Sequence, residues 1–501
     1  MDRVTVPVEL FVSSWTSSSA SGSGSRLLHE ESSQPDTARA HPSSSRTSQA
    51  RAIICPIVFI SVSSARSADH PGRRRPDSPA LYNHPQSPDK SRRTLWKTAI
   101  ASAQAILTPP PLFCTLPSIV NLLLLTWNFP PAVGGMEAMM DHLFRGLRRR
   151  GHSVRAVTTR GDGEPMEDVH RAPRPGVPAY LLFSFFRGWT LCRKQRPDFI
   201  LCGSVLSAPA GWLLSVLLRV PWGVPLYGSD LLAGGRAYRL LLRFLLRRAR
   251  RLFPISRFTR SLAEQLGVDT RRAVLIPPGV DVHPFEQEPA EGAETLLALC
   301  EHRRILLTAG RLVRRKGVLE FVRDAMPELI RRFPDLLFLV VGDDGAQSLI
   351  HKKEGMRRQI EDVIRRQGLE QQVRLLGRLP DRDLIRLYFH ADVFVLPGLD
   401  LPGDVEGFGI VFSEAALAGV PAVATRTGGV PDAIEDGQTG VLVPPGDTPA
   451  IVEAVSSLLR DDEKRRRMGR AAAQRARDTL AWEVIVSRYD QAIRDALASG
   501  N

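Results

Sequence analysis

Two glutamates eight positions apart, Glu406 and Glu414, lie on either side of a Gly-Phe-Gly turn and are the residues best suited to chemistry in this chain. If every residue between them were helical, the two carboxylates would lie about 12 Å apart along the helix axis. Gly407 and Gly409 indicate instead that the first turn is a loop and that a helix begins near Gly409. That helix would present unpaired N–H groups and the positive end of its dipole. Carboxylates beside such groups suit a ligand that is both polyhydroxylated and phosphorylated.

A second candidate is the basic loop GRLVRRKG, which follows the predicted strand ILLTAG. Arg311 offers a flat fork for two phosphate oxygens, and Lys316 offers a compact charge. Opposite the glutamate loop, these two cations would bind a diphosphate and stabilise it as it leaves. A nucleotide sugar carries both the hydroxyls and the phosphates that the two loops suit. Because Arg314 and Arg315 add two further cations, a loop whose charges are merely solvated is the alternative.

Gly134 and Gly135, at the start of a predicted helix, form a third candidate. Two residues without side chains would let a phosphate approach the backbone closely. The surrounding sequence lacks the GxGxxG spacing of a dinucleotide fingerprint. A plain tight turn is therefore the alternative.

Strands and helices alternate from residue 118 to residue 497. The run SIVNLLLLTW is too continuously apolar for a half-exposed strand and indicates a buried parallel one; a glycine turn, a helix and the strand HSVRAVTT follow it. The same alternation of strands and helices continues in the second half of the chain, with the predicted strands ILLTAG, LLFLVVG, VRLLG, VFVLP, PAVAT and GVLV. Helices are expected between them and after them, at residues 318–332, 351–367, 381–390, 448–459, 461–478 and 482–497. This pattern predicts an α/β protein with two doubly wound, Rossmann-like domains.

The chain divides into four segments. Residues 1–117 are rich in Ser, Arg and Pro and lack periodicity, which predicts a low-complexity, disordered segment or sequence upstream of a mis-assigned start. Residues 118–295 form the first domain and end in an acidic linker at 287–295, and residues 296–480 form the second. Residues 481–501 are expected to form a helix that crosses back to the first domain.

Composition and charge narrow the possible partners. Residues 301–501 carry equal numbers of acidic and basic side chains, so the net charge of +14 belongs to the first 300 residues. The chain has no basic run interleaved with aromatic residues, which argues against nucleic acid as a partner. Its five cysteines include no CxxC pair, which indicates neither a disulfide framework nor a zinc site and favours a reducing, cytoplasmic compartment.

Two segments raise the question of a membrane. Residues 199–218 hold no charge and are long enough to span a bilayer, but Pro209 and the flanking Arg219-Val220-Pro221 indicate a strand followed by a separate helix. Arg236–Arg251 is expected to be an amphipathic helix with one Arg face and one Leu/Phe face. Docking on an anionic membrane surface is one interpretation of this helix, and a packed helix with a solvated basic edge is the other.

Five motifs occur in one order between residue 118 and the C-terminus: FPPAVGGMEAMM, IPPGVDVHPF, GRLVRRKG, EGFGIVFSEAALAGVPAVAT and GGVPDAIEDGQTGVLVPP. Together they resemble the retaining glycosyltransferases of family 4, the glycosyl transferases of group 1. The resemblance implies the GT-B fold, in which two Rossmann-like domains face each other across a cleft. It also implies that the N-terminal domain binds the acceptor and that the C-terminal domain binds a nucleoside diphosphate sugar.

The resemblance assigns roles to individual positions. Arg311 and Lys316 would hold the donor diphosphate and stabilise it as leaving group, and Glu406 would contact hydroxyls of the donor sugar. Glu414 would accept from the ribose hydroxyls. The further donor-binding positions that it implies are Gly134, Gly135, Phe408, Gly409, Ile410, Gly342, Asp343 and Arg378. Many members carry His-Gly where this chain has Tyr227-Gly228-Ser229-Asp230, so Tyr227 or Asp230 would take over a contact with the donor sugar or the acceptor.

The activity implied is transfer of a hexosyl group to a lipid-linked or saccharide acceptor, with retention of configuration, at the inner face of a membrane. No cofactor and no metal are expected, because Arg311 and Lys316 would balance the charge of the diphosphate. The only Asp-x-Asp, at Asp381 and Asp383, is interpreted as a helix start. A synthase of the same fold with a soluble acceptor and an inactive sugar-nucleotide-binding protein are the alternatives.

Overall fold

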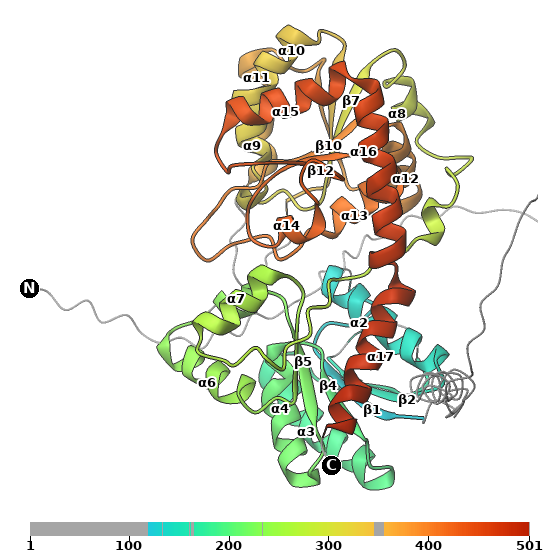
Figure 1. Cartoon of the computed structure of the whole chain (residues 1–501), viewed down its shortest axis with the longest axis vertical. Coiled ribbons are helices and arrows are strands. Elements are labelled where there is room, and N and C mark those ends of the chain that lie inside the picture. The colour runs from blue at the N-terminus through green and yellow to red at the C-terminus, as the bar shows by residue number, and fades with distance from the viewer. Residues whose placement is uncertain are drawn as a thin grey trace, which may run out of the picture. The chain divides into compact units, whose positions relative to one another are not determined.

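The structure is a computed structural model, and it describes residues 119–132, 134–159, 161, 165–232, 234–344 and 355–499 (Figure 1). These residues belong to one compact unit. The prediction for residues 1–117 lies outside the described residues, as do residues 351–354 of the expected helix at 351–367.

The first domain is built on a six-stranded parallel sheet with the strand order β3-β2-β1-β4-β5-β6. All of its strands except the short edge strand β3 are largely buried, as the continuous apolar runs predict. They are β1 (Asn121–Thr126), β2 (Ser153–Thr158), β3 (Val169–Arg171), β4 (Phe199–Cys202), β5 (Trp222–Leu226) and β6 (Arg251–Pro254). Its helices are α2 (Gly135–Arg149), α3 (Val177–Lys194), α4 (Ala208–Leu218), α5 (Ser229–Leu232), α6 (Arg236–Leu246) and α7 (Arg257–Gln265).

The second domain repeats this architecture in a six-stranded parallel sheet with the order β12-β11-β10-β7-β8-β9. Its strands are β7 (Arg304–Ala309), β8 (Leu336–Val341), β9 (Val373–Gly377), β10 (Val393–Leu396), β11 (Ala422–Thr425) and β12 (Gly440–Val443). Its helices are α8 (Glu294–Ala298), α9 (Val318–Glu320), α10 (Met326–Arg332), α11 (Met356–Gln367), α12 (Asp381–His390), α13 (Ile410–Leu417), α14 (Val430–Ala433), α15 (Thr448–Arg460) and α16 (Asp462–Arg475).

The strand order reverses direction once in each sheet, between β1 and β4 and between β7 and β10. Ligands of open α/β sheets bind outside the carboxyl ends of the strands at such switch points. The loops that follow β1, β7 and β10 contain Gly134, the GRLVRRKG motif and Glu406. All three candidate sites of the sequence therefore lie at switch points.

One expectation about the first domain needs correction. The amphipathic helix expected over Arg236–Arg251 ends at Leu246, because Arg250 donates its backbone N–H to Trp222 O and Arg251 already begins β6.

The apolar segment at residues 199–218 forms β4 and α4, in agreement with the prediction that it is no single helix. Within the described part of the chain, no helix is both long and apolar enough to cross a bilayer.

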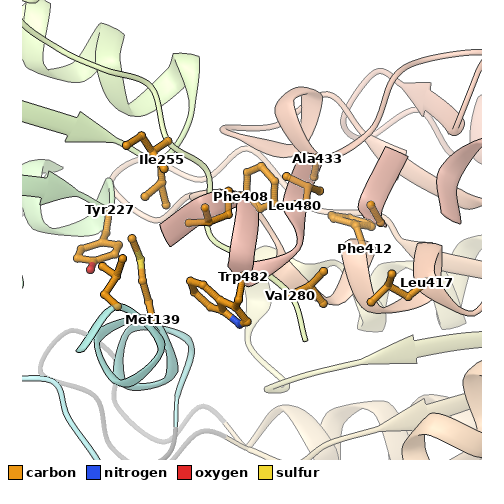
Figure 2. Close-up of a cluster of buried hydrophobic side chains, with 14 of the residues drawn as sticks. Met139, Tyr227, Ile255, Val280, Phe408, Phe412, Leu417, Ala433, Leu480 and Trp482 are labelled. Carbon is orange, nitrogen blue, oxygen red and sulfur yellow. The ribbon is translucent and has the colours of Figure 1, made fainter. Parts of the chain in front are cut away.

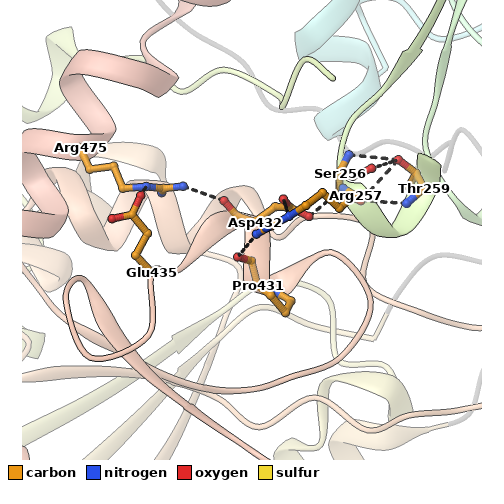
Figure 3. A network of polar contacts seen from close by, with 7 residues as sticks. All are labelled: Ser256, Arg257, Thr259, Pro431, Asp432, Glu435 and Arg475. Carbon is orange, nitrogen blue, oxygen red and sulfur yellow. Dashed lines mark hydrogen bonds and ion pairs between the residues drawn. The ribbon is translucent and has the colours of Figure 1, made fainter. Parts of the chain in front are cut away.

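The two domains share one apolar core cluster. Figure 2 shows Phe408 of the second domain between Tyr227 and Ile255 of the first domain and Leu480 near the C-terminus. At the edge of this contact, Arg257 at the start of α7 donates to both carboxylate oxygens of Asp432, from its backbone N–H and from Nε at 2.8 Å each (Figure 3).

The C-terminal helix α17 (Trp482–Ala498) packs on α2 of the first domain (Figure 1). Trp482 stacks on His142 with 4.5 Å between the ring centroids. Further along the helix, a Cβ on Gly146 would lie 2.5 Å from Val486 Cγ2, so α2 and α17 approach closely at this glycine.

Asp490 is the polar centre of the α17 contact. It accepts from Arg150 Nε at 2.9 Å and from His152 Nε2 at 3.1 Å, while His152 Nδ1 accepts from the backbone N–H of Val120. Burial lowers the pKa of His152, and the Asp490 carboxylate only partly opposes that effect. The imidazole is therefore neutral and donates through Nε2.

Replacing Asp490 by Ala should destabilise the chain by about 3 kcal/mol, because it leaves a buried imidazole and Arg150 without their partner. Thermal unfolding followed by circular dichroism measures the loss. Asp495→Ala, an exposed change on the same helix, serves as control. Equal unfolding temperatures for the two variants would contradict the role of Asp490.

Candidate active site

The GRLVRRKG loop after β7 buries one of its cations. Lys316 lies at the end of a short 3₁₀ turn and its side chain is only 9% exposed. A Cβ on Gly310 would lie 2.9 Å from Lys316 Nζ, so the absence of a side chain at position 310 makes room for the ammonium group. Arg311 is exposed on the same loop.

Arg315 is a site residue that the sequence analysis missed. Its side chain is 11% exposed, donates from Nη1 to Glu406 Oε2 at 2.6 Å and pairs through Nε with Asp404 Oδ1 at 3.1 Å. Its carbonyl oxygen accepts from the backbone N–H of Leu399. In the sequence, Arg315 is one of four similar cations in the loop. In the structure, its side chain is bonded to the glutamate loop.

Glu406 lies between two cations. Its Oε2 is 2.6 Å from Arg315 Nη1 and 3.8 Å from Lys316 Nζ, and its side chain is 18% exposed. Burial raises the pKa of this carboxyl, but the charges of Lys316 and Arg315 oppose burial and leave the pKa below its ordinary value. Glu406 is therefore a partly buried, ionised acceptor.

The Gly-Phe-Gly turn after Glu406 is a loop, and α13 begins at Ile410, as the two glycines predict. Gly409 has a φ of 88°, in the left-handed region that favours glycine. A Cβ on Gly407 would lie 2.6 Å from the carbonyl oxygen of Tyr227, so this turn lies directly against the first domain. Phe408 fills the core beneath it.

A second glycine pair, Gly428-Gly429, supports the same turn. Gly429 donates its N–H to Glu406 O at 2.8 Å, and a Cβ on Gly429 would lie 1.8 Å from Gly407 O. Neither glycine was given a role by the sequence analysis, although the GG of the motif GGVPDAIEDGQTG is a visible signal. Both leave space for the backbone of the Glu406 loop.

Glu414, on α13, accepts a hydrogen bond from the hydroxyl of Tyr388 at 2.9 Å. Burial raises its pKa above the ordinary value, and the bond from Tyr388 opposes that effect. Burial also lowers the pKa of Lys316, while the charges of both Glu406 and Glu414 raise it. The charges of both glutamates therefore act on this one ammonium group.

Gly134 and Gly135 lie at the N-terminus of α2, close to the N-terminus of α13. A Cβ on Gly135 would lie 3.1 Å from Ile410 Cδ1. The carboxylate of Glu137 folds back over Gly134, since a Cβ there would lie 2.3 Å from its Oε2, and Asn128 donates to its Oε1 at 2.7 Å. An anionic group at this helix end would share the positive end of the dipole with Glu137.

Three further positions that the resemblance implies for donor binding, Gly342, Asp343 and Arg378, lie at the carboxyl ends of β8 and β9, beside that of β7. Gly342 donates to Gly377 O at 2.7 Å, and a Cβ on Gly342 would lie 2.0 Å from Gly310 O. Asp343 and Arg378 follow on these strand ends, and Arg378 is exposed. These residues therefore neighbour the basic loop in space.

The side chains of Tyr227 and Asp230 make their hydrogen bonds within the first domain, but Oδ2 of Asp230 is buried without a hydrogen-bond partner. Tyr227 donates its hydroxyl to Gly203 O at 3.0 Å, and Asp230 Oδ1 accepts from the backbone N–H of Gly228 at 2.9 Å. Burial raises the pKa of Asp230 to about 6, against these backbone hydrogen bonds. Tyr227 contacts the Glu406 loop through its backbone carbonyl oxygen, which lies against Gly407. A contact of either side chain with a sugar stays a prediction.

Two family models match the chain, one on each domain. The Glycosyl transferase 4-like domain matches residues 134–279, and Glycosyl transferases group 1 matches residues 297–475. The second match contains Arg311, Arg315, Lys316, Glu406 and Glu414.

Named relatives and solved structures agree with these models. The D-inositol 3-phosphate glycosyltransferase of Corynebacterium aurimucosum is 30% identical over 338 residues, which cover 63% of this chain and 75% of that protein. The GDP-mannose-dependent alpha-(1-6)-phosphatidylinositol monomannoside mannosyltransferase of Mycolicibacterium smegmatis is 36% identical over 239 residues, 47% of this chain and 59% of that protein. The structure of HepE from Anabaena in complex with UDP and glucose has a TM-score of 0.60 at 21% identity, and the match covers 76% of this chain and 100% of HepE.

At that level of identity the structural match shows the fold alone, and it agrees with the two parallel six-stranded sheets. The family is shown by the sequence. The chain therefore belongs to the group 1 glycosyltransferases, a family of transferase enzymes, and has their GT-B fold.

Proposed function

We propose that the chain transfers a hexosyl group from a nucleoside diphosphate sugar to a lipid-linked or saccharide acceptor, with retention of configuration and without a metal. The observation that carries the proposal is the buried cluster of Arg315, Lys316 and Glu406 beside the N-termini of α2 and α13. It combines a cation for a diphosphate with an ionised acceptor for hydroxyl groups.

The donor would be held by the second domain. Arg311 and Lys316 would bind the diphosphate, and they would stabilise the charge that grows on it as the bond to the sugar breaks. Glu406 would accept from hydroxyls of the sugar, beside the backbone N–H groups of Phe408, Gly409 and Ile410. The glycine-rich ends of β7, β8 and β9, with Gly342, Asp343 and Arg378, would lie beside the nucleobase.

Glu414 would accept from the ribose hydroxyls, with Tyr388 holding one of its oxygens. Gly134 and Gly135 would approach the phosphates from α2. Because Glu137 already lies at that helix end, the charge of the diphosphate would be balanced mainly by Arg311 and Lys316.

Retention requires the acceptor hydroxyl to enter on the face from which the diphosphate leaves. In the proposed step, the acceptor oxygen bonds to the anomeric carbon as the bond to the diphosphate oxygen breaks. The hydroxyl proton passes to that phosphate oxygen. The chain's part in this step is to hold the sugar through Glu406 and the diphosphate through the two cations.

Two relatives support an acceptor that is phosphorylated or carried by a lipid. One is named for D-inositol 3-phosphate and the other for a phosphatidylinositol mannoside. A donor made of a nucleotide and a sugar is supported by the HepE complex with UDP and glucose and by the GDP-mannose dependence in the second relative's name.

An anionic membrane surface is proposed as a second partner, through α6 and its neighbours α3 and α4. Most of the exposed large apolar side chains among the described residues lie on these three helices: Leu182, Phe186, Leu213, Val216, Leu217, Leu240, Leu241 and Phe244. Trp212 of α4 contacts Phe244 of α6 edge to face, so the two helices form one surface. Arg236, Arg239, Arg243, Arg247 and Arg248 are exposed on and just after α6. Apolar side chains bordered by arginines complement anionic lipid headgroups.

Lys316→Ala and Glu406→Ala should each lower the turnover of a nucleotide sugar about 100- to 1,000-fold, since each removes a group that stabilises the reacting donor. Release of UDP from UDP-glucose and of GDP from GDP-mannose measures the effect, with and without an inositol phosphate or lipid acceptor. Arg314→Ala, an exposed change on the same loop, is the control. Unchanged turnover in both test variants would contradict the assignment of Lys316 and Glu406 to the site.

Tyr388→Phe should weaken nucleotide binding most strongly under acidic conditions. Without the hydroxyl that opposes burial, the pKa of Glu414 rises further, so the carboxylate that accepts from ribose is protonated at a higher pH. We expect UDP or GDP to bind about threefold to tenfold more weakly near pH 6. Calorimetric titrations from about pH 5 to about pH 8 measure the shift.

The control for this change is Tyr489→Phe, which removes a buried hydroxyl on α17. If Tyr388→Phe bound the nucleotide like the native chain at every pH, Glu414 would have no role in ribose recognition.

Leu240→Glu combined with Leu241→Glu should abolish vesicle binding, because both exposed side chains would enter the lipid interface. Sedimentation with phosphatidylglycerol vesicles, compared with phosphatidylcholine vesicles at low and high salt, measures it. Leu299→Glu, on the second domain, is the control. Vesicle binding that depends neither on the charge of the lipid nor on the salt concentration would contradict the proposal.

A further inference from the structure

Arg315 belongs to the cluster on which the proposed function rests, but that proposal gives it no contact with the donor. Its side chain joins Glu406 and Asp404, and its carbonyl oxygen joins Leu399. A Cβ on the next glycine, Gly317, would lie 2.0 Å from Pro397 O, so the two loops are also in backbone contact there. Both the backbone and the side chain of Arg315 therefore link the loop after β7 to the loop after β10.

The geometry separates the two cations that face Glu406. Arg315 makes a short hydrogen bond to Oε2, whereas Lys316 Nζ lies at 3.8 Å, beyond hydrogen-bond distance. Both act on the same oxygen, and among the described residues no side chain or backbone group donates a hydrogen bond to Oε1. The ammonium group of Lys316 is thus available for a phosphate, and Oε1 is available for a hydroxyl.

We propose that Arg315 is the positioning residue of the donor-sugar site: it holds Glu406 by Oε2, leaves Oε1 for a sugar hydroxyl and keeps Lys316 free for the diphosphate. This inference rests on the proposed function. Without Arg315, the carboxylate would draw Lys316 toward itself, because that ammonium group is the next nearest cation. The diphosphate would then lose a charge as the sugar lost its orientation.

Because charged groups surround Glu406, the effect of Arg315 on the pKa of Glu406 can be measured from the pH dependence of activity. Arg311, Arg315 and Lys316 act on it from the loop after β7, Asp404 lies on the same loop as Glu406, and the charge of Glu414 acts on Lys316. The first domain brings a carbonyl oxygen and the apolar Ile255 to this loop. Removing Arg315 leaves burial less opposed, so the pKa of Glu406 rises and the carboxylate is protonated at a higher pH.

The test is Arg315→Ala in the full chain, assayed by nucleotide release from UDP-glucose and GDP-mannose. We expect kcat/KM to fall about 10- to 100-fold near neutral pH, as for the loss of a charge-assisted hydrogen bond. We also expect the acidic limb of the pH profile to move upward by about one pH unit. Arg315→Lys keeps the charge but cannot bond Glu406 and Asp404 together, so it should restore the pH profile and only part of kcat/KM.

Arg314→Ala is the matched control, because it removes the same side chain from the neighbouring exposed position. A pH profile that does not move in Arg315→Ala would overturn the inference, whether or not the rate falls, since a purely structural role predicts a lower rate with an unchanged profile. An unchanged kcat/KM would overturn it as well. Lys316→Ala separates the two proposals: if that variant loses activity while Arg315→Ala does not, only the inference about Arg315 fails.

Discussion

The close approach of glycine backbones around Glu406 is the constraint on which the site depends. Glu406 lies in a loop before α13, so no helix or strand fixes its backbone. Its position is set by Gly429, which donates to Glu406 O, and by Gly407, which lies against the carbonyl oxygen of Tyr227. A side chain at either glycine would collide with backbone atoms that cannot move aside cheaply. The carboxylate is thus held by main-chain packing, and the cations of the loop after β7 are arranged around it.

The two glutamates of the site differ because their neighbours differ. Both are buried, and burial alone would raise the pKa of each. Lys316 and Arg315 reverse that effect at Glu406, while at Glu414 a neutral hydroxyl from Tyr388 only weakens it. Glu406 therefore stays charged over a wider range of pH than Glu414. In the proposed site, a hydroxyl group at Glu406 would meet an ionised acceptor near neutral pH, whereas a hydroxyl group at Glu414 would meet an acceptor whose charge depends more on pH.

Sequence periodicity predicted the sheets and most of the helices, because buried parallel strands are continuous apolar runs and helix starts carry Gly, Pro or Asp. It missed α3, whose apolar side chains point outward as well as inward, with Leu182 and Phe186 exposed. It also extended α6 into residues that turn and pair with β5. Arg311, Lys316, Glu406 and Glu414 could be proposed from residue type and spacing. Arg315 could not, because its type matches its neighbours and its partner lies 91 positions away in the sequence.

The division of contacts between and within domains has a consequence for donor binding. Arg315, Lys316, Glu406, Glu414 and Tyr388 all belong to the second domain, so their mutual contacts do not require the first. Between the domains, the Arg257–Asp432 pair is mostly exposed on the arginine side, at 73%, and such pairs contribute about 0–1 kcal/mol. The apolar cluster around Phe408 and the glycine contacts at Gly407 and Gly135 carry the rest. A rearrangement between the domains would leave the mutual contacts of these residues in place, but it would change the approach of α2 to α13 and the contact of Gly407 with Tyr227. Under the proposed function, the second domain would therefore set the affinity for a nucleotide, and the first domain would decide whether a bound sugar meets its acceptor.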